Sequence, residues 1–176
     1  MSPDFGEMRR YLELSWDGHQ NHPLSAQKSV RRHDGVTPYA VHPRLAADLF
    51  ISEPRLNLEL RWLGWRALVL HDFLEDTCLG FPPWVPSEVQ ELVRELTFEG
   101  FEEEQNLIWG RSETAQLLKL YDKATNLFDG SWMFNRGVGY RIRYLGFAQR
   151  LADAAEIKHG LLVAIQLVRG LRHDEY

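Results

Sequence analysis

Apolar and polar residues follow a helical period over nearly the whole length of this chain. Apolar positions recur at spacings of three and four residues, which is typical of helices that bury one face. No segment has the strict alternation of apolar and polar residues that favours a half-buried strand. The pattern therefore predicts an all-α protein.

Capping residues and helix breakers divide this pattern into separate helices. Ser2 and Pro3 are typical of a helix start, Ser87 with Gln90 forms a capping box, and Ser112 is a third cap. A loop is expected over 17–23, and an acidic, weakly amphipathic stretch over 99–109. No repeat or linker divides residues 1–176, which predicts a single domain. The predicted helices cover about 3–16, 24–32, 42–50, 55–77, 87–97, 112–129, 140–158 and 161–169.

Composition and charge narrow the functional classes. A chain of 176 residues with 44% hydrophobic residues is long enough to bury a core. Its net charge of -5 argues against a surface that coats a nucleic acid polymer, because phosphate backbones select for excess Lys and Arg. The single cysteine, Cys78, forms no internal disulfide, which suits a reducing cytoplasm. The N-terminus lacks the apolar region of a signal peptide, and no apolar run is long enough for a membrane span. We therefore expect a cytoplasmic protein with no membrane contact.

The run HDFLEDT carries the densest group of chemically useful side chains. If it is helical, residues four apart share a face, so His71 lies over Glu75 and Asp72 over Asp76. Carboxylates crowded in a cleft repel one another, and their pKa values rise unless a cation neutralises them. Mixed nitrogen and oxygen ligands of this kind are typical of manganese, iron or zinc sites.

Two further segments supply matching residues. PYAVHP carries His42 upstream, and KLYDKATNL carries Asp122 and Asn126 one helical turn apart downstream. Lys119 and Lys123 are also one turn apart, and a helix pair that brings Asp122 to a metal would place a lysine near the rim of the site. A water acidified by the metal is the expected nucleophile, and Glu75 or Asp76 would hold it or relay its proton.

Taken together, these motifs resemble the HD-domain hydrolases, and among them the small stand-alone (p)ppGpp hydrolases of the RelA/SpoT-homologue family. The matching pieces occur in the family's order and span about residues 31–129. The resemblance implies an HD-domain helical bundle that hydrolyses a 3′-pyrophosphate from a guanosine nucleotide. The matching pieces are RRHDGVTPYAVHP, ALVLHDFLEDT, VQELVRELT and LLKLYDKATNLFD.

The resemblance also implies roles for individual residues. Manganese would be the metal, and Glu75 and Asp76 would be the catalytic pair that orients the water. Asn126 would contact the sugar or phosphate region of the nucleotide, and Arg32 its base or phosphate. The implied metal ligands are His42, His71, Asp72 and Asp122.

The segment after VQELVRELT departs from the family. It reads FEGFEEEQN where the family commonly carries lysines and arginines, so a highly charged substrate is less welcome there. Lys119 and Lys123 could compensate, although most lysines on a helix face are simply solvated. Tyr140 with Tyr144 could line a base pocket, but packing between the last helices is the interpretation that the pattern favours. Three functions stay open: an alarmone hydrolase, a hydrolase of another nucleotide or nucleoside phosphate, and a catalytically silent module that binds nucleotide or a protein partner. Oligomeric state is not determined by the sequence.

Other side chains have simpler interpretations. His33 is an alternative to His42 as a metal ligand. His19 and His22 lie in a polar segment and are predicted to be surface residues, and Cys78 is predicted to pack in the interior. His159 is expected to stabilise the negative end of the helix in which it lies.

Overall fold

The computed structural model describes residues 4–31, 35–128 and 136–171 of the chain. Among these residues the chain is helical, without a β-strand, and only two isolated bridges join extended residues. Two short 3-10 turns lie at Ala26–Lys28 and Ile108–Gly110. The helices are α1 (Phe5–Asn21), α2 (Val41–Ile51), α3 (Leu58–Val69), α4 (Phe73–Asp76), α5 (Ser87–Leu96), α6 (Phe101–Leu107), α7 (Glu113–Phe128), α9 (Val138–His159) and α10 (Val163–Gly170).

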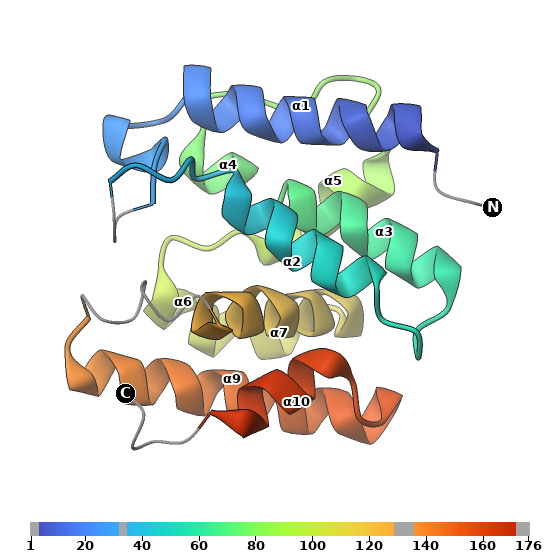
Figure 1. The fold of residues 1–176 in the computed structure, drawn as a ribbon, viewed down its shortest axis with the longest axis vertical. Coiled ribbons are helices and arrows are strands. Elements are labelled where there is room, and N and C mark those ends of the chain that lie inside the picture. The colour runs from blue at the N-terminus through green and yellow to red at the C-terminus, as the bar shows by residue number, and fades with distance from the viewer. Residues whose placement is uncertain (1–3, 32–34, 129–135, 172–176) are drawn as a thin grey trace.

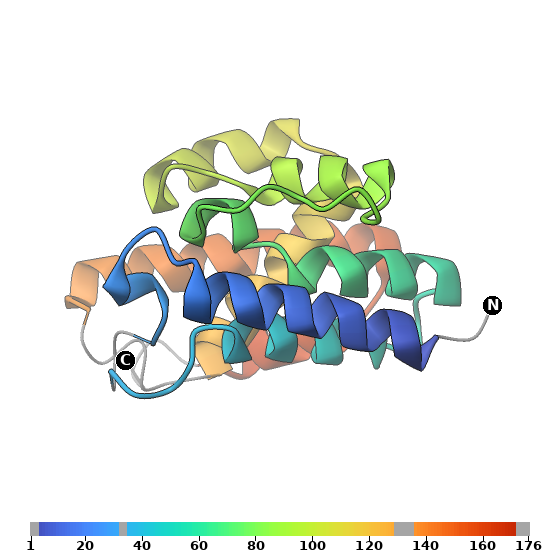
Figure 2. The same ribbon diagram turned by 90° about the horizontal axis from the view of Figure 1, so that it is seen from above.

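Helix α7 lies in the middle of the bundle. Figure 1 shows it between α2 and α3 on one side and α9 and α10 on the other, with α1 outermost beyond α2 and α3. Seen from above, α5 and α6 lie on the opposite side of the molecule from α1 (Figure 2). Most of α7 is buried, polar residues included, so its second half can present side chains to a site inside the protein.

Two glycines allow close helix packing. A Cβ at Gly64 of α3 would lie 2.1 Å from Phe50 of α2, and one at Gly18 of α1 would lie 2.5 Å from Phe73 of α4. Neither distance is compatible with a real side chain at the glycine position without movement of its neighbour. These contacts fix α2 against α3 and α1 against α4, the elements that border the site described below.

The N-terminal boundaries differ from the prediction. Helix α1 starts after Asp4, whose carboxylate accepts the Gly6 N–H at 2.9 Å, and it continues to Asn21, so the loop expected from residue 17 is wrong over this stretch. Gly18 does not break α1, because it forms the close contact with α4. The helix expected over 24–32 is only a 3-10 turn, and the expected cap at Ser2 lies outside the described residues.

The helix expected over 55–77 is interrupted where the motif HDFLEDT begins. Helix α3 starts at Leu58, capped by Asn57, and ends at Val69. Short i→i−3 bonds, Leu70 N to Ala67 O and His71 N to Leu68 O, tighten the chain before α4 begins. His71 therefore lies outside a helix, contrary to expectation, whereas Asp72 and Asp76 keep the one-turn relation that was predicted, with the Asp76 N–H donating to Asp72 O at 2.9 Å.

The remaining boundaries agree more closely with expectation. Ser112 Oγ accepts the Ala115 N–H at 3.1 Å at the start of α7, as predicted. Ser87 is the first residue of α5 and not its cap, because Pro86 occupies the cap position without a side-chain bond. Gly160, with a φ of 71°, ends α9. No helix in the described part of the chain is both long and apolar enough to span a membrane.

Candidate metal centre and nucleotide pocket

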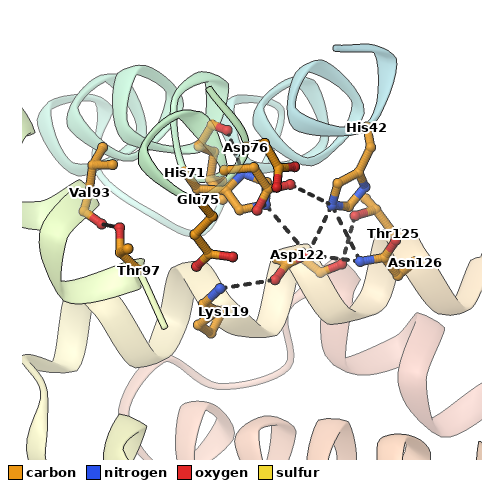
Figure 3. A network of polar contacts seen from close by, with 12 residues as sticks. His42, His71, Glu75, Asp76, Val93, Thr97, Lys119, Asp122, Thr125 and Asn126 are labelled. Atoms are coloured by element: carbon orange, nitrogen blue, oxygen red, sulfur yellow. Dashed lines mark hydrogen bonds and ion pairs between the residues drawn. The ribbon is translucent and has the colours of Figure 1, made fainter. Parts of the chain in front are cut away.

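Three parts of the chain bring their polar side chains to one buried point. His42 comes from the first turn of α2, His71 and Asp72 from the turn between α3 and α4, and Asp122 from the middle of α7. Figure 3 shows His42 and His71 lying next to each other above α7, with dashed lines from both to Asp122. All four side chains are almost fully buried. The tertiary fold thus assembles the set that the sequence singled out.

The distances within this group are short. His42 Nε2 lies 3.0 Å from Asp122 Oδ1, and His71 Nε2 lies 3.6 Å from the same oxygen. His71 Nε2 is 3.1 Å from Asp72 Oδ1, and His42 Nε2 is 3.9 Å from Asp72 Oδ2. Ligand atoms of His42, His71 and Asp72 all lie within 4.8 Å of one another, which is compact enough to surround one ion.

The tautomer of His71 tests whether this group fits a metal. His71 Nδ1 lies 2.7 Å from the Leu68 carbonyl, to which it can only donate. Its Nε2 is then free of that proton, is buried, and has no hydrogen-bond partner. A backbone carbonyl that fixes one ring nitrogen while the other faces the ion is the usual arrangement of a ligating histidine. The residues present therefore fit a divalent metal.

The pKa shifts within the group also favour a positive charge at its centre. Burial lowers the pKa of His71, but the Asp72 and Asp122 carboxylates outweigh it and raise this pKa to about 9. Burial raises the pKa of Asp72, yet the two imidazoles bring it down to about 2. The pKa of His42 is lowered, chiefly by burial. A raised pKa on His71 beside a lowered pKa on Asp72 means that the cluster favours a positive charge among its carboxylates, carried either by a proton on His71 or by a metal ion.

Glu75 and Asp76 face different surroundings. Glu75 Oε1 accepts the Phe98 N–H at 2.8 Å, and its side chain borders the pocket described below. Burial raises the pKa of Glu75 to about 7. Asp76 instead forms an ion pair with Lys28, while burial and the nearby Asp72 raise its pKa to about 6. Only Glu75 of the two borders the pocket.

Lys119 and Lys123 are buried and not at the rim, contrary to expectation. Their ammonium groups lie 3.4 and 3.0 Å from Asp122 Oδ2. Glu104 of α6, also buried, places Oε1 2.7 Å from Lys123 Nζ and 3.6 Å from Lys119 Nζ. The burial of Asp122 raises its pKa, but Lys123 and Lys119 hold it well below the usual value.

A cavity of about 140 Å³ is bordered by His42, Asp72 and Asp122 of this cluster. Asn126 donates to Asp122 Oδ1 at 2.9 Å and accepts from Arg31 Nη2 at 3.2 Å. Tyr140 and Tyr144 border the cavity with ring centroids 6.0 Å apart, and Tyr144 is also part of the buried core, as the packing interpretation expects. The cavity is lined by Arg31, Tyr39, His42, Asp72, Glu75, Phe101, Glu104, Lys119, Asp122, Lys123, Asn126, Tyr140 and Tyr144.

The sequence pattern did not predict several of the residues that line the pocket. Arg31 lies in the pocket, whereas Arg32, the predicted contact, falls outside the described residues together with His33. The doublet Arg31-Arg32 was a usable signal, but the pattern alone does not tell which of two adjacent residues points inward. Tyr39 donates to Asp72 Oδ2 at 3.1 Å, and its position within the motif PYAVHP is the signal that could have identified it.

Predictions for three outlying side chains have mixed outcomes. His19 is fully buried against the Tyr39 ring, with centroids 5.1 Å apart, so its assignment to the surface is wrong. Burial lowers the pKa of His19 to about 4, and neither ring nitrogen has a hydrogen-bond partner. His22 is exposed, as predicted. Cys78 is exposed and not packed inside, contrary to prediction.

Comparisons with known proteins were informative for structure and not for sequence. No protein-family model matches the chain, and no curated protein sequence matches it. Among solved structures, the chain is similar to a metazoan ortholog of SpoT that is described as hydrolysing ppGpp and playing a role in starvation responses. The TM-score is 0.66 at 22% identity, over 97% of this chain and 95% of the other. The chain thus combines the predicted all-α HD-domain fold with a buried His-His-Asp cluster suited to a divalent metal.

Proposed function

We propose that this chain is a metal-dependent phosphohydrolase of a nucleotide, with guanosine 3′,5′-bis(diphosphate), ppGpp, as its substrate. The observation that carries the proposal is the convergence of His42, His71, Asp72 and Asp122 at one buried point, with Glu75 beside it. Similarity to the structure of a ppGpp-hydrolysing protein supports the choice of substrate. The reaction would cleave the 3′-pyrophosphate and release pyrophosphate.

Manganese is the metal we propose, held by the four residues of that cluster. The two imidazoles in this set argue against calcium and magnesium, which prefer sites made of oxygen ligands, and mixed nitrogen and oxygen sets of this kind are typical of manganese, iron or zinc. When bound, such an ion acidifies water and stabilises negative charge on a phosphoryl group. The buried, low-pKa carboxylates of Asp72 and Asp122 stay ionised at neutral pH and so remain competent ligands.

Glu75 is the proposed proton acceptor. Its pKa of about 7 lets it take up a proton from the attacking water and release it again near neutral pH. The Phe98 N–H fixes one of its oxygens, which orients the other. Asp76, the second member of the proposed catalytic pair, would act by holding Lys28 and by keeping negative charge beside Asp72.

The nucleotide would occupy the cavity on the α7 and α9 side of the metal. Asn126 and Arg31 form a hydrogen-bonded pair that borders the cavity beside Asp122, where a ribose or phosphate can accept from them. Tyr140 offers a ring for the base, and Lys119 and Lys123 offer positive charge. Arg32 is a further proposed contact of the base or phosphate. A cytoplasmic location and a small-molecule substrate, without a nucleic acid polymer, complete the proposal.

A second substrate class is favoured by one specific observation. A hollow of about 440 Å³ shares Glu75 with the cavity as a lining residue, and Glu99 and Glu103 also line it. Lys28 is the cation among its lining residues, and Asp76 already pairs with it. A nucleotide with fewer phosphates than ppGpp would meet less repulsion from this lining.

The test is release of phosphate and pyrophosphate from a panel of nucleotides, with manganese present or replaced by EDTA. The panel contains ppGpp, pppGpp, 3′-phosphorylated nucleotides, deoxynucleoside triphosphates and nucleoside monophosphates. Manganese-dependent release of pyrophosphate from ppGpp is the expected result. Turnover of another member alone would replace the substrate and keep the site. Metal binding without any turnover would instead identify a sensor module.

A further inference from the structure

Helix α6 places one carboxylate inside the cavity. Glu104 is 5% exposed, whereas its neighbour Glu102 is exposed and Glu103 is half-buried. Phe101, the first residue of α6, packs its ring against Tyr140 and Tyr144, with centroids 5.1 Å from each. This aromatic contact holds α6 beside the pocket. Of the three consecutive glutamates in α6, Glu104 is the one that is buried there.

Glu104 forms ion pairs with two lysines that line the cavity. Lys123 Nζ lies between Glu104 Oε1 at 2.7 Å and Asp122 Oδ2 at 3.0 Å, and Lys119 Nζ lies 3.6 and 3.4 Å from the same two oxygens. Asp122 belongs to the same helix as both lysines, whereas Glu104 comes from a different one. The two ammonium groups and the two carboxylates thus neutralise one another within the pocket.

Stability alone is a poor reason to bury this group. Taking a carboxylate and two ammonium groups out of water costs several kcal/mol per ion, and buried ion pairs often contribute no more than an apolar replacement. Glu104 nevertheless lines the same cavity as Asp72, Glu75 and Asn126. A negative oxygen there occupies the position in which an anionic ligand would meet Lys119 and Lys123.

We propose that Glu104 is a specificity-determining residue that takes the place of a substrate phosphate in the empty pocket. An entering phosphate group displaces the Glu104 carboxylate from Lys119 and Lys123, so only an anion that binds these lysines better than the carboxylate can enter. Weakly charged anions such as inorganic phosphate are excluded, and a pyrophosphate group is admitted. This inference rests on the proposed function, because it assigns the lysines of that same site to the substrate.

The first experiment measures anion binding without turnover. Inorganic pyrophosphate and inorganic phosphate are titrated by calorimetry into metal-free chain and into chain loaded with one equivalent of manganese. Glu104→Gln removes the charge and keeps the shape, so pyrophosphate should bind about tenfold more tightly and phosphate should become detectable. Glu102→Gln is the matched control: it changes the net charge equally on the same helix but at an exposed position, and binding should stay within about twofold.

A second variant keeps the test decisive if Glu104→Gln does not fold. Glu104→Asp keeps the charge but shortens the side chain by one methylene, which withdraws the carboxylate from Lys123. Pyrophosphate binding should tighten here as well, by less than in Glu104→Gln. Wild-type chain adds a third measurement: pyrophosphate should speed amide hydrogen exchange over Phe101–Leu107, because it releases the Glu104 contact. Slower or unchanged exchange in that helix would contradict displacement.

These outcomes separate the inference from the proposed function. If wild-type chain hydrolyses a nucleotide but both Glu104 variants bind pyrophosphate no better than wild type, the displacement of Glu104 is wrong and the hydrolase stands. If no nucleotide is hydrolysed yet Glu104→Gln binds pyrophosphate more tightly, the anion site stands without the activity. For an active enzyme, a lower KM in Glu104→Gln at nearly constant kcat is the expected kinetic result, which a merely structural role would not produce.

Discussion

Asp122 borders two clusters of buried charge that differ in how they are neutralised. On its Oδ1 side lie His42, His71 and Asp72, whose nitrogen and oxygen lone pairs face one another. On its Oδ2 side lie Lys119, Lys123 and Glu104, in which each ammonium contacts two carboxylates. We call these the ligand cluster and the lysine cluster. One carboxyl group thus belongs to both.

The difference lies in what each cluster requires from outside. In the ligand cluster, imidazole nitrogens and carboxylate oxygens face one another, and a proton on His71 or a metal ion would supply the positive charge between them. The lysine cluster is already balanced by its own residues, so an incoming anion must compete with Glu104. Under the proposed function, a metal would therefore add the positive charge that the ligand cluster favours, whereas a phosphate would have to displace Glu104 from the lysines.

The largest effect is expected from breaking the ligand cluster. His71→Ala removes the nitrogen that faces both carboxylates, so bound manganese should be lost and activity should fall by about three orders of magnitude. Metal content by elemental analysis and nucleotide turnover are measured on the same preparation. His22→Ala, at an exposed position, is the control. Full metal content in His71→Ala would remove this residue from the proposed ligands.

Glu75→Gln should separate chemistry from metal binding. The amide cannot accept a proton, so kcat should fall by about two to three orders of magnitude while metal content stays at the wild-type level. Glu99→Gln is a matched control, because Glu99 lines the same hollow but is exposed and does not border the cavity. A fully active Glu75→Gln would disprove the assignment of proton transfer to this residue.

The ligand cluster was predictable from sequence, and the lysine cluster was not. His42, His71, Asp72 and Asp122 each sit in a motif whose order and neighbours identify it, and their convergence needs only that the helices pack. The position of Glu104 depends on how α6 approaches α7, and nothing in the run EEE distinguishes its third member. Long-range contacts of this kind leave no local pattern.

Helix boundaries failed for a similar reason. The break between α3 and α4 comes from tightened backbone bonds near Leu70 and from the His71 side chain, which donates to the Leu68 carbonyl. Local periodicity predicted one uninterrupted helix there. Gly18 was interpreted as part of a loop, whereas it lies inside α1 because α4 packs directly against it. Both errors arise where tertiary packing overrides a local preference.

A stability measurement can sharpen the contrast between the clusters. Lys123→Met leaves Glu104 and Asp122 with Lys119 as their remaining shared lysine, so the free energy of unfolding should fall by about 3–5 kcal/mol. The double variant Lys123→Met with Glu104→Leu should recover most of that loss, because the stranded carboxylate is gone. Urea unfolding with and without manganese checks this. Loss of stability that appears only with manganese present would contradict a cluster neutralised by its own residues.

The smallest effect concerns His19, a buried imidazole outside both clusters. Burial lowers its folded-state pKa from 6.5 to about 4, so between these values the unfolded chain binds a proton that the folded chain does not. Stability from this group is present above pH 6.5 and is lost as the pH falls toward 4, by about 2–3 kcal/mol at pH 4.5. His19→Gln cannot take up that proton, so its deficit relative to wild type should shrink by this amount between pH 7 and 4.5 in metal-free urea unfolding. A difference between His19→Gln and wild type that stays constant over this pH range would place the pKa of His19 near the ordinary value.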